Sequence, residues 1–159
     1  MVVIRRHSEA DLQKRFFTFI RRLATFDPRM GLVYSVPNEG AQTERRRLYC
    51  YRLGMTRGIS DVNVDIPSKD GQYGYLRLEF KSTSGYQSPD QKAYQSLVSS
   101  HGKGKYAICR TISDALRVLA DHFGDPISHW QMLFWKYGPK ETSKKQRLPS
   151  LQDVLGEFA

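Results

Sequence analysis

The chain has 159 residues, 40% of them hydrophobic, which is enough for the core of one domain of ordinary size. Its 25 Lys and Arg against 16 Asp and Glu give a net charge of +9, which favours a polyanionic partner, nucleic acid above all. No apolar run approaches the roughly 20 residues needed to span a membrane, and we expect neither a membrane partner nor a secretory signal. Cys50 and Cys109 are too few and too distant for a disulfide framework, so we expect an intracellular protein, in the cytoplasm of a bacterial, phage-infected or other host cell or in a nucleus.

Hydrophobic periodicity predicts an α/β fold with the element order α-β-α-β-β-α-β-α. Turn residues such as Gly, Pro and Asp-Gly separate the predicted elements. This order is typical of a mixed β-sheet flanked by helices. In chain order, we expect a helix over 8–26, a strand over 32–36, a helix over 42–53, strands over 61–66 and 75–82, a helix over 89–100, a buried strand over 106–110 and a helix over 113–123.

The composition changes beyond the last predicted helix. Residues 129–137 are dense in aromatic side chains, and residues 138–147 are polar and basic. An aromatic block of this kind packs on a core, forms a dimer interface, or stacks on unpaired bases. We therefore divide the chain into a core over 1–124 and an extension over 125–159, and we expect the extension to pack on the core or on a dimer partner.

Glu79 and Lys81 share one face of the predicted strand 75–82, because successive side chains of a strand point to opposite faces. Apolar side chains take the other face and can bury it. A carboxylate and an ammonium group side by side on a rigid strand suit a site that binds a metal ion and manages the charge of a phosphate. A lone Glu-x-Lys pair is far more typical of an ordinary surface ion pair, so the interpretation needs further residues.

Asp61 begins the preceding strand, 61–66, and supplies a second carboxylate. The Asp70-Gly71 pair between the two strands favours a hairpin connection. Pairing of the two strands brings Asp61 toward Glu79, and two carboxylates are the hard oxygen ligands that Mg²⁺ or Mn²⁺ prefers. Lys81 can then offset negative charge on a phosphodiester in its transition state.

Three short segments and one glutamine, spaced along the chain, contain either characteristic glycines or chemically active side chains. They are Pro37-Asn38-Glu39-Gly40, Gly54-Met55-Thr56-Arg57-Gly58-Ile59-Ser60-Asp61, Glu79-Phe80-Lys81 and Gln91. Their order and spacing resemble the virus-type replication-repair nuclease (VRR-NUC) branch of the PD-(D/E)XK nucleases. The Gly-x-x-x-Gly-x-x-Asp string is the specific part, and the resemblance covers roughly residues 8–123.

The resemblance implies a restriction-endonuclease-like fold and assigns roles to individual residues. Asp61 and Glu79 would be metal ligands, Lys81 the cation that orients water or stabilises the transition state, and Gln91 a helper near that water. Gly54 and Gly58 would shape the turn that delivers Asp61, although they would equally cap a helix and form a loop.

The chain departs from the pattern of this family at two positions. Ser60 replaces the proline of the superfamily name, and Glu39 stands where a second glycine is frequent. Neither change removes a chemical group that the mechanism needs.

The resemblance further implies a Mg²⁺- or Mn²⁺-dependent endonuclease that hydrolyses DNA phosphodiester bonds. We expect a homodimer that selects branched DNA, such as four-way junctions. A restriction-type duplex endonuclease and a non-catalytic nucleic-acid-binding module are the alternatives.

Two acidic or polar residues have competing roles. Gln91 is either an active-site residue or the third residue of a capping box that Ser88 begins. Glu9 is either a further metal ligand or simply an acidic residue in the first turn of a helix, where the helix dipole favours it.

Clusters of basic residues predict contacts with the DNA backbone, although each cluster alone is also typical of a solvated helix face. The stretch over 102–105 lacks P-loop spacing, so we expect no nucleotide cofactor. The nucleic-acid-binding candidates are Arg45, Arg46, Arg57, Lys103 and Lys105.

Overall fold

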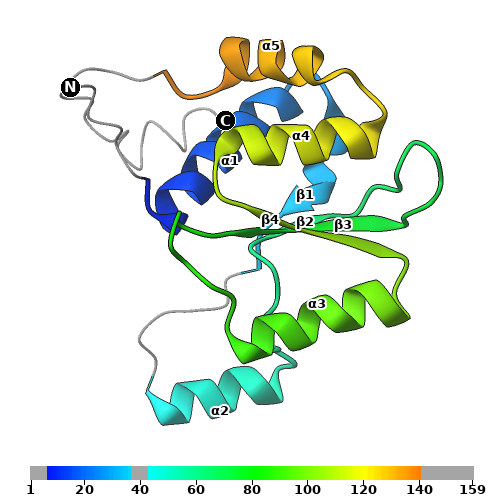
Figure 1. Cartoon of the computed structure of the whole chain (residues 1–159). Helices are drawn as coiled ribbons and strands as arrows, with labels where there is room; N and C mark the ends of the chain where they lie inside the picture. Colours follow the sequence, from blue (N-terminus) through cyan, green and yellow to red (C-terminus); the bar gives the residue numbers. More distant parts are fainter. Residues whose placement is uncertain (1–6, 37–42, 141–159) are drawn as a thin grey trace.

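The computed structural model describes residues 7–36 and 43–140, and within them the predicted order of helices and strands is confirmed (Figure 1). A short 3₁₀ helix, η1, and a fifth α-helix, α5, are additions to that order. The elements are α1 (Glu9–Ala24), η1 (Pro28–Leu32), β1 (Val33–Tyr34), α2 (Glu44–Arg52), β2 (Val62–Val64), β3 (Tyr75–Phe80), α3 (Pro89–His101), β4 (Gly104–Cys109), α4 (Ile112–Phe123) and α5 (Ile127–Tyr137).

The strands form one mixed sheet in the order β1-β2-β3-β4. β1 and β2 are antiparallel, β2 and β3 form the predicted antiparallel hairpin, and β3 and β4 are parallel. Val62 pairs with Leu78 and Val64 with Leu76, so that both apolar sets lie on one face of the sheet. The predicted mixed sheet flanked by helices is therefore confirmed.

The two faces of the sheet differ in character. Helices α1, α4 and α5 lie over one face, and α3 lies over the other (Figure 1). The apolar core fills the first layer, where the inward side chains of β2 and β3 meet buried residues of the three helices. α3 buries only Val98 among its own residues. The second face is therefore free to carry polar side chains, and it includes Arg77 and Glu79 of β3.

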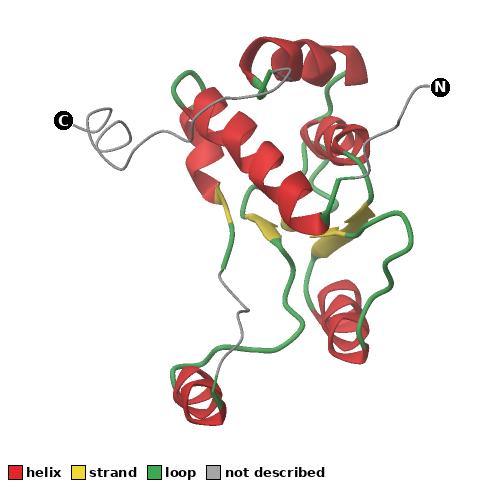
Figure 2. Cartoon of the chain, turned by 90° about the vertical axis from the view of Figure 1, so that its left-hand side faces the viewer, coloured by secondary structure: helices red, strands yellow, loops and turns green. Residues whose placement is uncertain are grey.

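Helix α2 differs from the other helices because it buries none of its residues. It lies between β1 and β2 in the sequence, and Figure 2 shows it set apart from the sheet and from α3. Its sequence, ERRRLYCYR, exposes arginines together with Leu48, Tyr49 and Tyr51. The hydrophobic effect of the core does not hold this helix in place.

Two strands differ from the sequence prediction. β1 is shorter than the predicted 32–36, and residues 37–42 lie outside the described part of the chain. β4 begins at Gly104 instead of Tyr106, and it is not the buried strand that we expected, because Ile108 is exposed. The reason is its position: β4 is an edge strand, which pairs with β3 on one side only.

The aromatic block of the extension forms α5, which packs on the core. Trp130 is 2% exposed and stacks on Phe123, with ring centroids 5.3 Å apart. The ring centroid of Phe134 lies 5.2 Å from that of Phe19 on α1. The described part of the extension thus packs on the core, whereas residues 141–159 lie outside the described residues and the division at residue 124 stays a prediction. No helix in the described ranges is long and apolar enough to cross a membrane.

We expect Trp130→Ala to lower the free energy of unfolding by about 3–5 kcal/mol, because it empties a buried site between α4 and α5. Trp135→Ala is the matched control: its side chain is 75% exposed on the same helix, and its loss should change stability by no more than about 0.5 kcal/mol. Urea denaturation measures both. Equal effects of the two substitutions would contradict the packing of α5 on the core.

Candidate active site

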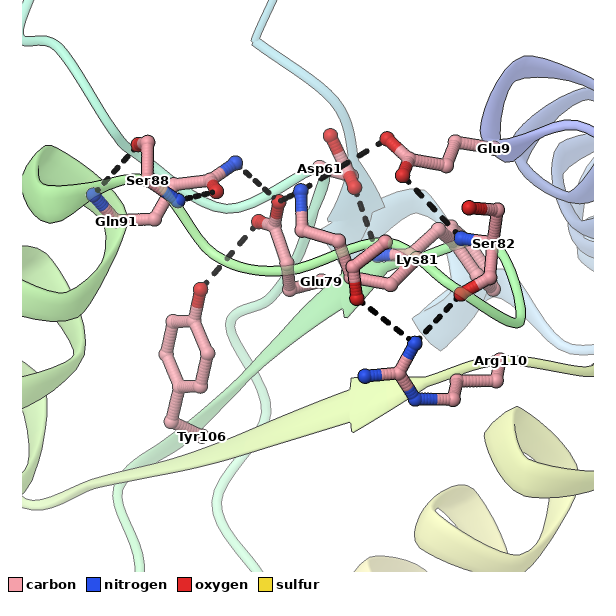
Figure 3. Close-up of polar contacts among 11 residues, drawn as sticks. Glu9, Asp61, Glu79, Lys81, Ser82, Ser88, Gln91, Tyr106 and Arg110 are labelled. Atoms are coloured by element: carbon pink, nitrogen blue, oxygen red, sulfur yellow. Dashed lines mark hydrogen bonds and ion pairs between the residues drawn. The ribbon is translucent and has the colours of Figure 1, made fainter.

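The candidate site lies at the carboxyl end of β3, where side chains from separate elements converge (Figure 3). Glu79 is on β3 itself, and Lys81 follows directly after the strand. The backbone N–H of Lys81 donates to the carbonyl of Cys109, 3.0 Å away, which ties this point to the end of β4. Strand geometry thus places the two charged side chains on the face that α3 covers.

Glu79 is 1% exposed, and both of its carboxylate oxygens have partners. Oε1 lies 3.1 Å from the ammonium Nζ of Lys81 and accepts a short hydrogen bond from Nε2 of Gln91. Oε2 accepts a longer hydrogen bond, 3.3 Å, from the hydroxyl of Tyr106. A carboxylate removed from water needs such partners, because an unpaired buried charge is very costly.

The surroundings of Glu79 favour its protonated form. Burial, reinforced by the negative charge of Asp61, raises the pKa of Glu79 to about 7, although Lys81 opposes the shift. The same burial, together with Glu79, raises the pKa of Tyr106 well above its usual range, so this hydroxyl keeps its proton and stays a donor. Two carboxylates near one another, one of them buried, form a site where a cation is favoured.

Asp61 reaches the site from the start of β2. Its Oδ2 accepts a hydrogen bond from the backbone N–H of Phe80, 2.7 Å away, so the carboxylate of one strand is fixed to the backbone of its neighbour. This contact follows from the antiparallel register, in which Val62 pairs with Leu78. The predicted hairpin therefore does place the second carboxylate beside β3.

Gly58 allows the loop before Asp61 to pack against the start of α3. It has a φ of +74°, and a Cβ at this position would lie 2.4 Å from the backbone carbon of Asp90 and 2.7 Å from the nitrogen of Gln91. Gly54 also has a positive φ, +89°, but open space surrounds it. The second glycine of the motif is thus required for close approach, whereas the first serves backbone conformation alone.

Gln91 forms the capping box and also contacts Glu79, while its role in catalysis stays a prediction. Ser88 and Gln91 form the expected capping box of α3, in which Oε1 of Gln91 accepts from the backbone N–H of Ser88 at 2.8 Å. The other end of the same amide, Nε2, donates to Glu79. Because the carbonyl is committed to the helix cap, the amide nitrogen is directed at the carboxylate.

Glu9 faces the site and does not cap its own helix. The capping box of α1 is formed by Ser8 and Asp11. The Glu9 carboxylate accepts a hydrogen bond from the N–H of Ser82 at 3.2 Å, and it lies 3.8 Å from Nζ of Lys81. The buried ammonium of Lys81 therefore sits between two carboxylates, Glu79 and Glu9.

The donor set fits a hydrated divalent cation on two carboxylates. Within residues 7–36 and 43–140, no three His, Cys, Asp or Glu side chains are grouped closely enough to hold a metal ion by themselves. Glu9 thus does not join Asp61 and Glu79 in a three-carboxylate cluster, and its role as a ligand stays a prediction. Mg²⁺ is commonly bound by one or two carboxylates, with waters and a substrate phosphate completing its shell.

The predicted DNA-binding residues are not all near this cluster. Arg45 and Arg46 are exposed on α2, and Arg57 is exposed in the loop that contains Gly58. Lys103 and Lys105 lie at the opposite end of the sheet, because Tyr75 pairs with Gly104 whereas Glu79 pairs with Ile108. At about 3.3 Å per residue, they are roughly 10–17 Å along the strand from the level of Glu79.

Sequence reasoning missed two residues around the site. Tyr106 bonds to Glu79 from β4, and Arg110, directly after β4, donates to backbone carbonyls of the segment that follows Lys81. Alternation along β4 does place Tyr106 and Ile108 on one face. The sequence carries no signal, however, for which strand β4 pairs with or in which register.

The chain is similar to known proteins in its structure and not detectably in its sequence. No protein-family model matches the sequence, and no curated protein matches it significantly. Among solved structures, the chain is similar to a "VRR_NUC domain protein", with a TM-score of 0.60 and 19% sequence identity over 76% of this chain and 92% of that chain. At this identity the similarity establishes the fold, which is the VRR-NUC-like fold that the sequence motifs indicate.

Gly58→Ala should lower the free energy of unfolding more than Gly54→Ala does, because only Gly58→Ala forces a Cβ against the backbone of α3. We expect the difference between the two variants to be about 1–3 kcal/mol. Gly54→Ala should itself cost about 1–2 kcal/mol, for backbone strain alone. Urea denaturation of the two variants measures the difference. If both lose the same amount, the close approach of Gly58 to α3 is not a constraint.

In metal-free buffer, we expect Glu79→Gln to stabilise the protein above neutral pH. The pKa of Glu79 is about 7 in the folded state and about 4.5 when unfolded, so the folded protein holds the proton more tightly between these values. The wild type should therefore lose up to about 3 kcal/mol of stability as pH rises from 4.5 to above 7, and the variant should not. Denaturation at several pH values in EDTA measures this, and parallel curves would contradict the burial of an ionisable Glu79.

Proposed function

We propose that the protein is a Mg²⁺- or Mn²⁺-dependent endonuclease that hydrolyses DNA phosphodiester bonds. The observation that carries the proposal is the buried pair of Glu79 and Lys81 at the end of β3, with the carboxylate of Asp61 held beside it. The VRR-NUC-like fold supports it.

Asp61 and Glu79 are the residues that would hold the metal ion, which when bound polarises the phosphate and lowers the pKa of a bound water. The raised pKa of Glu79 supports this assignment, since a divalent cation relieves the repulsion between the two carboxylates. Hydrogen bonds from Tyr106 and Gln91 hold the Glu79 carboxylate in one orientation.

Lys81 supplies a positive charge that is fixed before the substrate arrives. Its side chain is buried, and its ammonium lies 3.1 Å from Glu79 and 3.8 Å from Glu9, so it has little freedom to move. A phosphodiester that gains negative charge in the transition state receives a stronger hydrogen bond from such a group. Lys81, together with Gln91, also orients the water whose oxygen forms the new bond to phosphorus as one P–O ester bond breaks.

The charge distribution suits contacts with the sugar-phosphate backbone. Arg45 and Arg46 are exposed on α2, and Arg57 is exposed on the loop that leads to Asp61. Lys103 and Lys105, at the other end of the sheet, would contact phosphates farther along the duplex. Contacts of this kind position DNA by its backbone and do not read base edges.

Branched DNA is the substrate class that we favour, cut by a homodimer. Two sites related by a twofold axis match the symmetry of a four-way junction. A restriction-type enzyme would use additional segments to read base edges in a groove. We therefore favour DNA structure over base sequence as the basis of selection, because of this match in symmetry.

We expect Glu79→Ala and Asp61→Ala to reduce cleavage about 100-fold or more while leaving DNA binding within a few-fold, because they remove metal ligands and no DNA contact. Lys81→Ala should lower the rate far more than the affinity. Lys103→Ala is the control, since it removes a lysine from the opposite end of the sheet and should affect binding only.

The assay uses labelled four-way junction, flap, splayed-arm and linear duplex DNA with Mg²⁺, Mn²⁺ or EDTA. Paired, metal-dependent cuts in the junction support the nuclease and, together with a dimeric mass in light scattering, the homodimer. Tight binding without cleavage of any substrate would indicate the non-catalytic module instead, and equal loss of binding and cleavage in the variants would give Asp61 and Glu79 a structural role only.

A further inference from the structure

Tyr86 is the most exposed large hydrophobic side chain in the described part of the chain, at 87%. It belongs to the segment over 82–87, which leads from Lys81 to Ser88, the cap of α3. One end of this segment therefore carries the buried ammonium group of the candidate site, and the other begins the helix that holds Gln91. An aromatic ring in water beside such a site contributes nothing to the core.

The segment that carries Tyr86 is held in place by two side chains from other elements. The guanidinium of Arg110 donates to the carbonyls of Ser82 and Gly85, the latter at 2.9 Å, and it lies near that of Thr83 as well (Figure 3). Glu9 accepts a hydrogen bond from the N–H of Ser82. The backbone is thus tied down directly before the point where it exposes its ring, and the cap of α3 at Ser88 follows two residues after it.

Packing around Gly85 shows how closely this segment fits. A Cβ at Gly85 would lie 2.8 Å from Oε1 of Glu9 and 2.9 Å from the hydroxyl oxygen of Ser82. The residue before Tyr86 is therefore pressed against the site while Tyr86 itself faces solvent. A ring presented on a constrained backbone loses little conformational freedom when it binds a flat partner.

DNA offers flat partners of this kind, but only where its base stack is interrupted. Every nucleobase has a face on which an aromatic ring can stack, without regard to sequence. In continuous duplex, neighbouring base pairs cover both faces. At a branch point, a flap or the edge of a single strand, one face is uncovered.

We propose that Tyr86 stacks on the uncovered face of a nucleobase next to the phosphate to be cut, and that Arg110 positions the segment that presents the ring. This inference rests on the proposed nuclease function and deepens it, because it assigns the preference for interrupted DNA to a particular side chain. Trp135, which is 75% exposed on α5, lies over the other face of the sheet and does not share this role.

The test uses a splayed-arm DNA and a four-way junction with 2-aminopurine at the branch point, and a linear duplex with 2-aminopurine in its middle. Stacking quenches 2-aminopurine fluorescence, so binding in EDTA or Ca²⁺ reports the contact without cleavage. We expect wild type and Tyr86→Phe to quench the branched probes. Tyr86→Ala should not, and it should raise KM for them about 5- to 100-fold while kcat stays within a few-fold.

Arg110 acts through the backbone, so its variants require a graded readout. Arg110→Ala should reduce the quenching, and Arg110→Lys, which keeps a cation with three donors, should recover part of it. Trp135→Ala should behave as wild type on every probe. Circular dichroism and melting curves establish that each variant is folded.

The outcomes separate this inference from the proposed function. If the wild type cleaves branched DNA and Tyr86→Ala does so with unchanged KM and quenching, the stacking inference fails and the nuclease stands. If Trp135→Ala loses as much as Tyr86→Ala, the effect is not specific to the site and the inference fails as well. If the wild type quenches the branched probes through Tyr86 but cleaves nothing with either metal, the stacking stands and the proposed nuclease fails.

Discussion

A carboxylate that is 1% exposed must find its compensation within the protein, and Glu79 finds it in donors from three directions. Lys81 comes from the end of the same strand, Gln91 from the first turn of α3 and Tyr106 from the neighbouring strand β4. Each of these donors depends on an element being in its observed position. The parallel pairing of β3 and β4, the cap of α3 and the hairpin that brings Asp61 close are thus all linked to one buried charge.

This arrangement explains why structural and chemical roles coincide in the same residues. Gln91 closes the capping box of α3 with one end of its amide and holds Glu79 with the other. Glu9 tethers Ser82 while lying near the ammonium of Lys81. For Gln91, the two alternatives that the sequence left open, a capping-box residue and an active-site residue, are therefore compatible in geometry. A small domain builds its site from the groups that already satisfy its helix ends.

Local rules predicted a large part of this architecture. Strand alternation placed Glu79 and Lys81 together, the Asp-Gly turn predicted the hairpin, and Ser88 with Gln91 predicted the start of α3. The residues that escaped prediction depend on contacts between distant segments. Tyr106 reaches Glu79 only through the register of a parallel strand pair, which the sequence does not specify, and the exposure of Ile108 follows from β4 lying at an edge. Gly58 was expected to shape a turn, but its contact with α3 requires the fold.

The exposed helix α2 is less stable than the sheet and the helices packed on it. A nine-residue helix that buries none of its residues is marginal in water, because nucleating a helix is costly and only packing normally repays it. The side chain of Thr43 caps the helix, and an N-cap of this kind typically contributes about 1 kcal/mol of stability. This is far less than a packed core contributes. Helix α2 and the sheet therefore unfold by separate equilibria, in the manner of independent cooperative units. A melting curve for this chain describes its sheet and the packed helices, and it says little about the helix that carries the arginines.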